Sequence, residues 1–128
     1  MPAVIGIEPS CVAVFKGELV NLWPNDEDAQ RLSRQTFHFS EFLAAEGWQP
    51  PQLQGKAMLH GHCHHKATGG VAPEQELLER MGLEVEELEA GCCGIAGGWG
   101  YERGQYDVSI ACGERVLLQR CGRRLPRR

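Results

Sequence analysis

The spacing of apolar residues along the chain predicts helices that alternate with strands. Residues 3–9, AVIGIEP, form an apolar, β-rich run that ends in proline, which indicates a buried strand entering a turn. A helix is expected next, capped by Ser10 and extending to about Trp23. The apolar residues that recur there at helical spacing are Val12, Phe15, Leu19 and Leu22.

The rest of the chain continues this alternation. An acidic start after Pro24 and apolar residues spaced by three and four predict a helix over 25–47. The segments expected after it are a strand over 56–60, a loop over 60–70, a helix over 73–81, an edge strand over 83–90 and a helix over about 106–120. This order predicts an α/β fold resembling a three-layer domain, with a small, mainly parallel sheet flanked by helices.

Cysteines follow three of the predicted strands. Cys11, Cys63 and the adjacent Cys92–Cys93 each come just after such a strand. Because functional loops in parallel sheets lie at the carboxyl ends of strands, these cysteine loops are expected to converge on one edge of the sheet. Cys11 is also expected in the first turn of a helix, where the dipole favours a thiolate.

Residues 60–65, HGHCHH, gather soft and borderline metal ligands around Cys63. A mononuclear zinc site is one interpretation, because zinc accepts both imidazole and thiolate. Consecutive side chains of an extended segment point to opposite faces, so few of them can bind one ion. The other interpretation has Cys63 as the ligand, with His60, His62 and His64 orienting and tuning it. A purely packed role for Cys63 is a third.

The stretch GCCGIAGGWG, residues 91–100, is too rich in glycine for a helix interior. Gly94, Gly97 and Gly98 allow the backbone to approach a bulky object closely and to offer N–H groups to sulfur. An iron–sulfur cluster is such an object, and adjacent thiolates at Cys92 and Cys93 suit two irons better than one zinc. The alternatives are two small buried cysteines or a phosphate loop, although no GKS or GKT follows.

Composition and charge narrow the function classes. The chain has 128 residues, 42% of them hydrophobic, which suits one globular domain. Its net charge of −4 includes five arginines in the last nine positions. The first 119 residues thus hold eight basic against seventeen acidic side chains, or −9, which disfavours nucleic-acid binding. No signal peptide or transmembrane run is evident, so the cytoplasm is the expected compartment, where cysteines stay reduced.

Three motifs in this order resemble a known family. EPSC (8–11), HGHCHHKA (60–67) and GCCGIAGGWGYE (91–102) are similar to the C-terminal cysteine-rich, CCG-type region of FAD-linked oxidases and their iron–sulfur subunits. Subunits of glycolate oxidase, anaerobic glycerol-3-phosphate dehydrogenase and heterodisulfide reductase belong to this group. The resemblance implies one domain over 1–119, in which 1–50 ends a first repeat and 56–119 is most of a second, followed by a basic, disordered tail at 120–128.

The resemblance also implies a ligand set and partners. Cys63 corresponds to the early ligand of a 4Fe–4S cluster, Cys92 and Cys93 to the paired ligands, and Cys11 to the closing cysteine of the preceding repeat. The closing cysteine of the second repeat has no counterpart, and Cys112 and Cys121 carry no ligand pattern. The FAD would lie on a missing upstream part or on a partner dehydrogenase chain, with a quinone or another acceptor downstream.

The resulting hypothesis is an electron-transfer fragment of an oxidoreductase that acts on a 2-hydroxy acid, resembling glycolate or lactate, and is not catalytic alone. The alternatives are a zinc-binding structural or interaction module and a metal-free remnant. Peripheral association with the inner face of the cytoplasmic membrane is an alternative to a purely cytoplasmic location.

Overall fold

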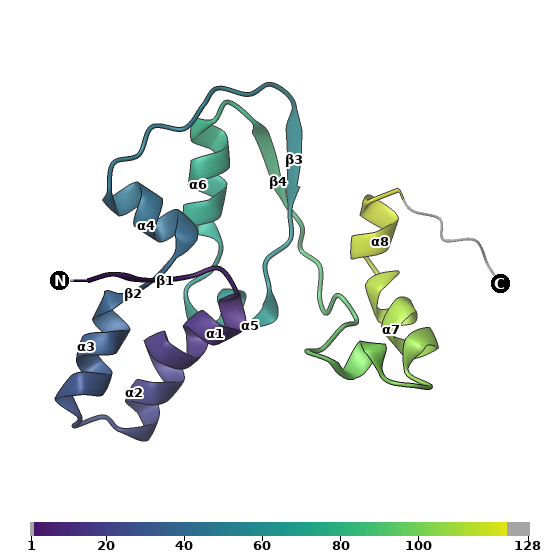
Figure 1. The fold of residues 1–128 in the computed structure, drawn as a ribbon. Coiled ribbons are helices and arrows are strands. Elements are labelled where there is room, and N and C mark those ends of the chain that lie inside the picture. The colour runs from purple at the N-terminus through teal and green to yellow at the C-terminus, as the bar shows by residue number, and fades with distance from the viewer. Residues whose placement is uncertain (1, 123–128) are drawn as a thin grey trace. The chain divides into compact units, whose positions relative to one another are not determined.

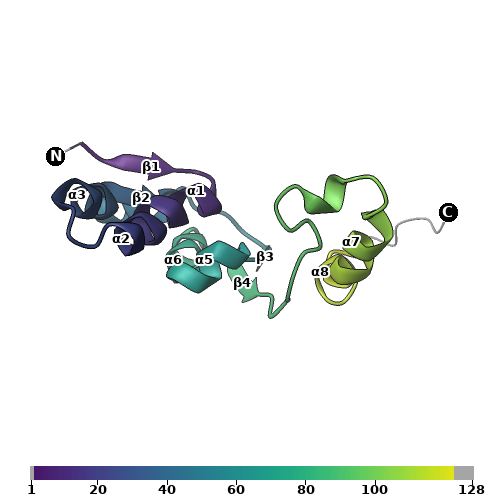
Figure 2. The ribbon, with the colours of Figure 1, turned by 90° about the horizontal axis from the view of Figure 1, so that it is seen from below.

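The computed structural model describes residues 2–122, which divide into two compact units: unit 1 ends at Glu86 and unit 2 begins at Glu87. Strands and helices alternate in unit 1, so the predicted α/β class is confirmed (Figure 1). The strands are β1 (Val4–Gly6), β2 (Thr36–His38), β3 (Lys56–Leu59) and β4 (Glu84–Glu87). They form two separate parallel pairs, β1–β2 and β3–β4, where the sequence suggested one sheet (Figure 2).

The first strand pair is joined by a long helical crossover. β1 and β2 are in register, with Val4 opposite Thr36 and Gly6 opposite His38. The predicted first helix is present as three consecutive segments: α1 (Pro9–Ala13), a π-helical turn η1 (Val14–Glu18) and α2 (Leu19–Leu22). Its N-cap is Glu8 in place of the expected Ser10, because the Glu8 carboxylate accepts from the Cys11 amide at 2.7 Å. α1 packs against both strands of the pair.

The helix expected over 25–47 is interrupted by β2. It consists of α3 (Glu27–Gln35), the three residues of β2, and α4 (Phe39–Ala45). The periodicity of apolar residues runs through the break, but pairing with β1 gives the backbone of β2 its hydrogen bonds and buries Thr36 and His38. Tertiary pairing therefore overrides local helix propensity here. Asp26 caps α3 through the Ala29 amide at 2.7 Å.

The second strand pair is joined by two helices. The predicted loop at 60–70 contains a short helix, α5 (Cys63–Thr68), followed by α6 (Ala72–Arg80). His62 forms the N-cap of α5, since its Nδ1 accepts from the His64 amide at 3.3 Å. α5 packs against α1, and α6 packs against α4, so these helices connect the two strand pairs of unit 1.

Unit 2 contains a glycine-rich loop and short helices. They are the 3₁₀ turn η2 (Trp99–Tyr101), α7 (Tyr106–Gly113) and α8 (Leu117–Arg120). The helix predicted over 106–120 is broken after Gly113, where the chain turns so that Leu118 lies against Gly113. The predicted tail at 120–128 lies largely outside the described residues, which end with Gly122 in a turn.

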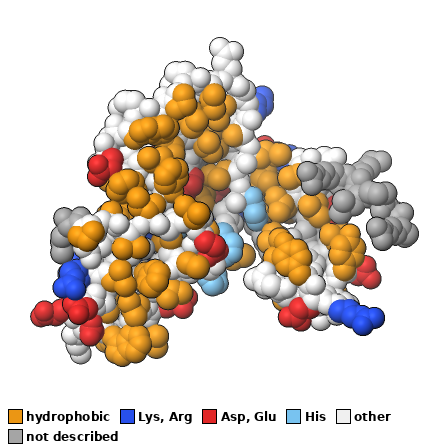
Figure 3. Space-filling view, viewed as in Figure 1, with side chains coloured by type: hydrophobic (Ala, Val, Ile, Leu, Met, Phe, Trp, Pro, Cys, Tyr) orange, Lys and Arg blue, Asp and Glu red, His pale blue; other side chains and the backbone are white. Residues whose placement is uncertain are grey.

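The buried apolar core is small. Val12 and Ala13 of α1, Ala29 of α3 and Val71 are its buried hydrophobic side chains in unit 1. Several large apolar side chains are instead exposed, and Figure 3 shows hydrophobic groups gathered over the α1–α2 region. Ile7 is 90% exposed and Leu22 70% exposed. Polar contacts between elements therefore contribute much of the order in unit 1.

Candidate functional site

The cysteines of unit 1 lie at the beginnings of two helices that pack together. Cys11 is in the first turn of α1, and Cys63 is the first residue of α5. Both are free and exposed. The expectation that Cys11 favours a thiolate is wrong, because the neighbouring Glu8 carboxylate, by hydrogen bond and by charge, raises the pKa of the Cys11 thiol.

The histidines expected around Cys63 have different environments. His62 and His64 are exposed, and their rings meet edge to face with centroids 5.4 Å apart. His60 is half-buried, and its Nδ1 is a buried atom that has no hydrogen-bond partner among the described residues. Burial, followed by the charge of Lys66, lowers the pKa of His60. Of the three, His62 has the clearest structural role, as the cap of the helix that begins with Cys63.

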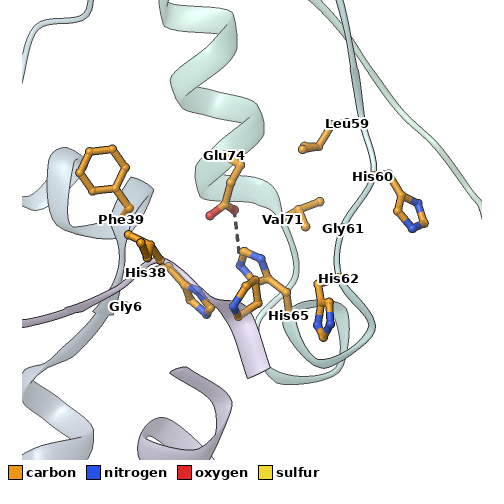
Figure 4. A pocket seen from close by; sticks show the side chains of 12 residues that line it. Gly6, His38, Phe39, Leu59, His60, Gly61, His62, His65, Val71 and Glu74 are labelled. Carbon is orange, nitrogen blue, oxygen red and sulfur yellow. Dashed lines mark ion pairs between the residues drawn. The ribbon is translucent and has the colours of Figure 1, made fainter. Parts of the chain in front are cut away.

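A buried polar cluster lies beside this segment, and the sequence analysis did not identify it. His38 and His65 are each 6% exposed, and their rings stack with centroids 3.9 Å apart. His65 Nε2 lies 3.5 Å from Glu74 Oε2, and the other carboxylate oxygen of Glu74 accepts from the Ser40 hydroxyl (Figure 4). We call these residues, His38, Ser40, His65 and Glu74, the histidine cluster.

The histidine cluster continues into the π-helical turn. Lys16 Nζ lies 2.6 Å from a carboxylate oxygen of Glu41, and the same oxygen accepts from the His38 amide at 2.8 Å. Burial opposes ionisation of Glu41, but the hydrogen bonds from Lys16 and from the His38 amide outweigh it and lower the pKa of Glu41. Burial lowers the pKa of His38, and the charge of His65 lowers it further. His38 is therefore held as neutral imidazole near neutral pH.

The Cys92–Cys93 loop of unit 2 is positioned by close backbone contacts. The Gly94 amide donates to Cys92 Sγ at 3.3 Å. Gly94 has φ +96, and a Cβ there would lie 2.0 Å from the Ser109 carbonyl oxygen of α7. A Cβ on Gly113 would lie 2.9 Å from the Cys93 carbonyl oxygen. Gly94 therefore lies in close contact with the backbone of α7, and the predicted close approach of this loop to a cluster stays a prediction.

The other two glycines singled out in this loop behave differently. Gly97 has φ +71, a backbone conformation that side chains rarely adopt, but a Cβ there would meet nothing within 4 Å. Gly98 caps η2 with an ordinary φ of −95 and also has open space around it. Gly97 is thus required for backbone conformation, whereas Gly98 leaves room beside the loop.

The donor groups fit a thiolate-bound cluster only in part. All six cysteines are free. Within residues 2–122, no three His, Cys, Asp or Glu side chains are grouped so that they could hold a metal ion. Unit 1 contributes Cys11 and Cys63, and unit 2 contributes the adjacent Cys92 and Cys93, whose loop places a backbone N–H on sulfur. The convergence of these thiols stays a prediction.

Sequence reasoning missed the histidine cluster because its members are far apart in the chain. Ser40 and Glu74 are separated by 34 residues, and no motif connects them. His65 was present in the HGHCHH motif, but its burial depends on the unexpected helix α5, which turns it towards α6. A helical interpretation of CHHKAT, residues 63–68, is the sequence signal that could have indicated that His65 is buried.

Comparison with known proteins finds dehydrogenases. Over 65 residues, 50% of its length, the chain is 37% identical to a subunit of anaerobic glycerol-3-phosphate dehydrogenase from Escherichia coli strain K12, and it covers 16% of that protein. In an alignment of 135 positions that includes 97% of the chain, it is 26% identical to D-2-hydroxyglutarate dehydrogenase of the same strain and covers 12% of that protein. The D-2-hydroxyglutarate dehydrogenase of Pantoea ananatis is 26% identical over 118 residues, with 11% of that protein covered.

The chain thus spans between 11% and 16% of the length of these relatives. No protein-family model matches it, and no solved structure matches it. The expected resemblance is confirmed at the level of the oxidoreductases: the chain is similar to parts of dehydrogenases, one of which is in the group that the motifs indicated. Among residues 2–122, no helix combines the length and apolar content needed to cross a bilayer.

Proposed function

We propose that this chain is part of an oxidoreductase in which it carries electrons through an iron–sulfur cluster. The relatives are named for glycerol 3-phosphate and D-2-hydroxyglutarate, each of which has a secondary hydroxyl that a dehydrogenase can oxidise. In this proposal, a flavin on another part of the protein or on a partner chain takes the electrons from a substrate of the 2-hydroxy acid type. The cluster passes them on to a quinone or another acceptor, and the chain is not the dehydrogenase by itself.

The observation that carries this proposal is the Cys92–Cys93 loop. Its two adjacent thiols are free, and the Gly94 N–H already donates to Cys92 Sγ at 3.3 Å. Backbone N–H groups on cysteine sulfur stabilise the negative charge of a cluster and tune its potential. The contact between Gly113 and the Cys93 carbonyl fixes the pair against α7. A preformed cysteine pair of this kind suits a bound inorganic cluster better than it suits simple packing.

Four thiols would hold the cluster in this proposal. Cys92 and Cys93 come from unit 2, and Cys63 comes from the start of α5. Cys11 is the fourth candidate, and its carboxylate neighbour Glu8 raises the pKa of its thiol. His60, His62 and His64 adjust the surroundings of Cys63. When bound, the cluster would supply one-electron transfer, while the glycine loop and these histidines set its potential.

The test is iron and acid-labile sulfide analysis, with visible and electron paramagnetic resonance spectra, on protein purified without oxygen. We expect iron and sulfide in about equal amounts and a broad brown absorption. Cys92→Ser and Cys93→Ser should each remove most of both. Cys121→Ser is the matched control, because Cys121 is exposed in the last described turn and should leave iron and sulfide unchanged.

Two results would overturn the proposal. One is stoichiometric zinc without sulfide in protein prepared and reconstituted anaerobically. The other is an iron content that stays the same in both Cys92→Ser and Cys93→Ser. An unchanged spectrum and an unchanged iron content in Cys11→Ser would keep the cluster and remove Cys11 from its ligands.

A further inference from the structure

Unit 1 contains a cavity that none of the proposed cluster ligands lines, although His60 and His62 are part of its wall. Its volume is about 350 Å³, within the range of small-molecule sites. Gly6, His38 and Leu59 line it, and these are the last residues of β1, β2 and β3. Ligands in parallel α/β structures bind at the carboxyl ends of strands, so this cavity has the location expected of a binding site.

Two buried polar atoms of residues that line the cavity, Glu74 Oε2 and His60 Nδ1, have no hydrogen-bond partner among the described residues. The other carboxylate oxygen of Glu74, Oε1, accepts from Ser40. The side chain of Glu74 is only 25% exposed. A buried acceptor without a donor is costly, and a ligand with a donor group would remove that cost. Figure 4 shows the Glu74 carboxylate directed at His65, with the rings of His38 and His65 side by side below it.

The charges around Glu74 select a neutral donor. An anionic ligand would place its charge against the carboxylate. A cationic ligand would compete with His65, whose Nε2 already lies 3.5 Å from Glu74 Oε2, and would lose its hydration among imidazole rings. A hydroxyl group needs no counter-ion and donates one hydrogen bond, which is what the free acceptor can take.

The rest of the cavity wall is made of imidazole rings and apolar side chains. Leu59, Val71 and Phe39 line it, and Val71 is 4% exposed. Figure 4 shows Leu59 and Val71 on the same side of Glu74, whereas the ring of His60 lies beyond the strand and away from the carboxylate. The site therefore combines the Glu74 carboxylate, which can anchor a donor group, with an apolar surface on Leu59 and Val71, and a compact ring with one hydroxyl matches both parts.

We propose that this cavity binds a hydroxyaromatic ring, whose hydroxyl donates to Glu74 Oε2 and whose face lies on Leu59 and Val71. The proposal does not depend on the proposed function, because every residue that it uses belongs to unit 1 and none is a cysteine. The site is distinct from the four candidate cluster ligands, although the strand that ends in Leu59 leads directly to Cys63.

The test is titration of the full chain with phenol, followed by ¹⁵N–¹H NMR spectra. We expect dissociation in roughly the millimolar range, as is usual for a ligand of seven heavy atoms. The largest shifts should be at the amides of Gly61, His65 and Val71. Toluene, which lacks the hydroxyl, should bind at least about tenfold more weakly, as should phenol to Glu74→Gln, since the charge-assisted bond is lost. Glu76→Gln, an exposed change on the same helix, should bind phenol like the parent.

Further variants separate this site from the cluster and from misfolding. Leu59→Ala removes part of the apolar wall and should weaken phenol several-fold. The double variant Cys92→Ser, Cys93→Ser should lose iron and still bind phenol, so failure of one proposal is distinguishable from failure of the other. Equal binding of phenol to the parent, Glu74→Gln and Leu59→Ala would overturn the inference. Tighter binding of benzylamine or benzoate than of phenol would overturn it as well.

Discussion

The two units of this protein fix their cysteines by different means. In unit 1, side chains position the cysteine. Cys63 is the first residue of α5, and the buried ring of His65 in α5 contacts Glu74 of α6. In unit 2, backbone does so: Gly94 and Gly113 let the cysteine loop lie directly against α7. Side-chain networks respond to pH and to changes of charge, whereas backbone contacts respond to the addition of a single methyl group. The difference therefore predicts separate ways to disturb each unit.

The largest effect is expected from Gly94→Ala. Its new Cβ would lie 2.0 Å from the Ser109 carbonyl oxygen, and φ +96 is unfavourable for alanine. We expect a loss of about 3 kcal/mol from the stability of unit 2, by overpacking and backbone strain together. Hydrogen exchange should become fast across α7, and residues 2–86 should keep their protection.

Gly97→Ala provides a graded control for that change. Gly97 also has a positive φ, +71, but open space surrounds it, so only the conformational cost of about 1 kcal/mol applies. Equal effects of the two substitutions would show that steric contact with α7 does not hold the cysteine loop. The conclusion that close backbone contacts position the cysteines of unit 2 would then be wrong.

Removing Glu74 is expected to give the largest effect in unit 1. Glu74→Ala leaves His65 and the Ser40 hydroxyl without their shared carboxylate partner. We expect a loss of about 2 kcal/mol in the free energy of unfolding, measured by urea titration. Glu76→Ala, on the same helix but exposed, should change the stability by less than about 0.5 kcal/mol. Similar losses in both variants would mean that α6 is stabilised by helix charge in general.

A smaller effect is expected from pH. The pKa of His38 is lowered from 6.5 in the folded chain, so the unfolded chain binds a proton first as the pH falls. The contribution of His38 to the free energy of unfolding is therefore fully present above pH 6.5. It declines as the pH falls below 6.5, and it stops changing once the pH is below the pKa that His38 has in the folded chain. Burial is the main cause of the shift. The charged groups facing His38 are His65 and Lys16, which lower the pKa, and Glu41 and Glu74, which raise it.

Urea unfolding midpoints measured from pH 7.5 to pH 5 would test this dependence. His38→Asn, which keeps a polar cap for α4 and removes the titrating ring, should flatten the curve over that range. An unchanged slope in His38→Asn would show that the pH dependence arises from groups other than His38.

The smallest effect is expected at an exposed ion pair between β3 and β4. Lys56 Nζ lies 2.9 Å from a carboxylate oxygen of Glu84, but the two side chains are 78% and 71% exposed. Solvent screens such a pair, so Lys56→Ala should cost about 0.5 kcal/mol or less, and 0.5 M salt should remove most of that difference. A larger, salt-resistant loss would show that polar contacts in unit 1 matter even at the surface.

The sequence predicted the elements of this fold better than their boundaries. Local signals were sufficient for the helix after Pro9, for α6 and for β3, because apolar spacing and turn residues agree there. The strand β2 was not predictable from spacing, since Thr36 and His38 form it only by pairing with β1. The break after Gly113 likewise depends on a contact between Gly113 and Leu118 that arises from folding.

The candidate site divides in the same way. The cysteines and glycines were visible because their chemistry is local and rare in combination. The sequence analysis expected a thiolate at Cys11 because the residue begins a helix. The nearby carboxylate of Glu8 instead raises the pKa of the thiol. The Ser40–Glu74 contact joins residues 34 positions apart, and one sequence alone contains no trace of it.

The π-helical turn at Val14–Glu18 has a consequence for insertions and deletions. Such a turn holds one residue more than an α-helical turn, so deletion of Gly17 would restore continuous α-helical bonding. Because the π-helical turn accommodates that extra residue by widening, the helix on either side would keep about its present orientation, and the residues of the turn itself would shift. Lys16 would turn away from Glu41, and Ser33 would lose the Lys16 carbonyl that it bonds at 2.9 Å. Loss of a single codon here would thus leave the helix continuous and remove the contacts by which the turn is attached to α3 and α4.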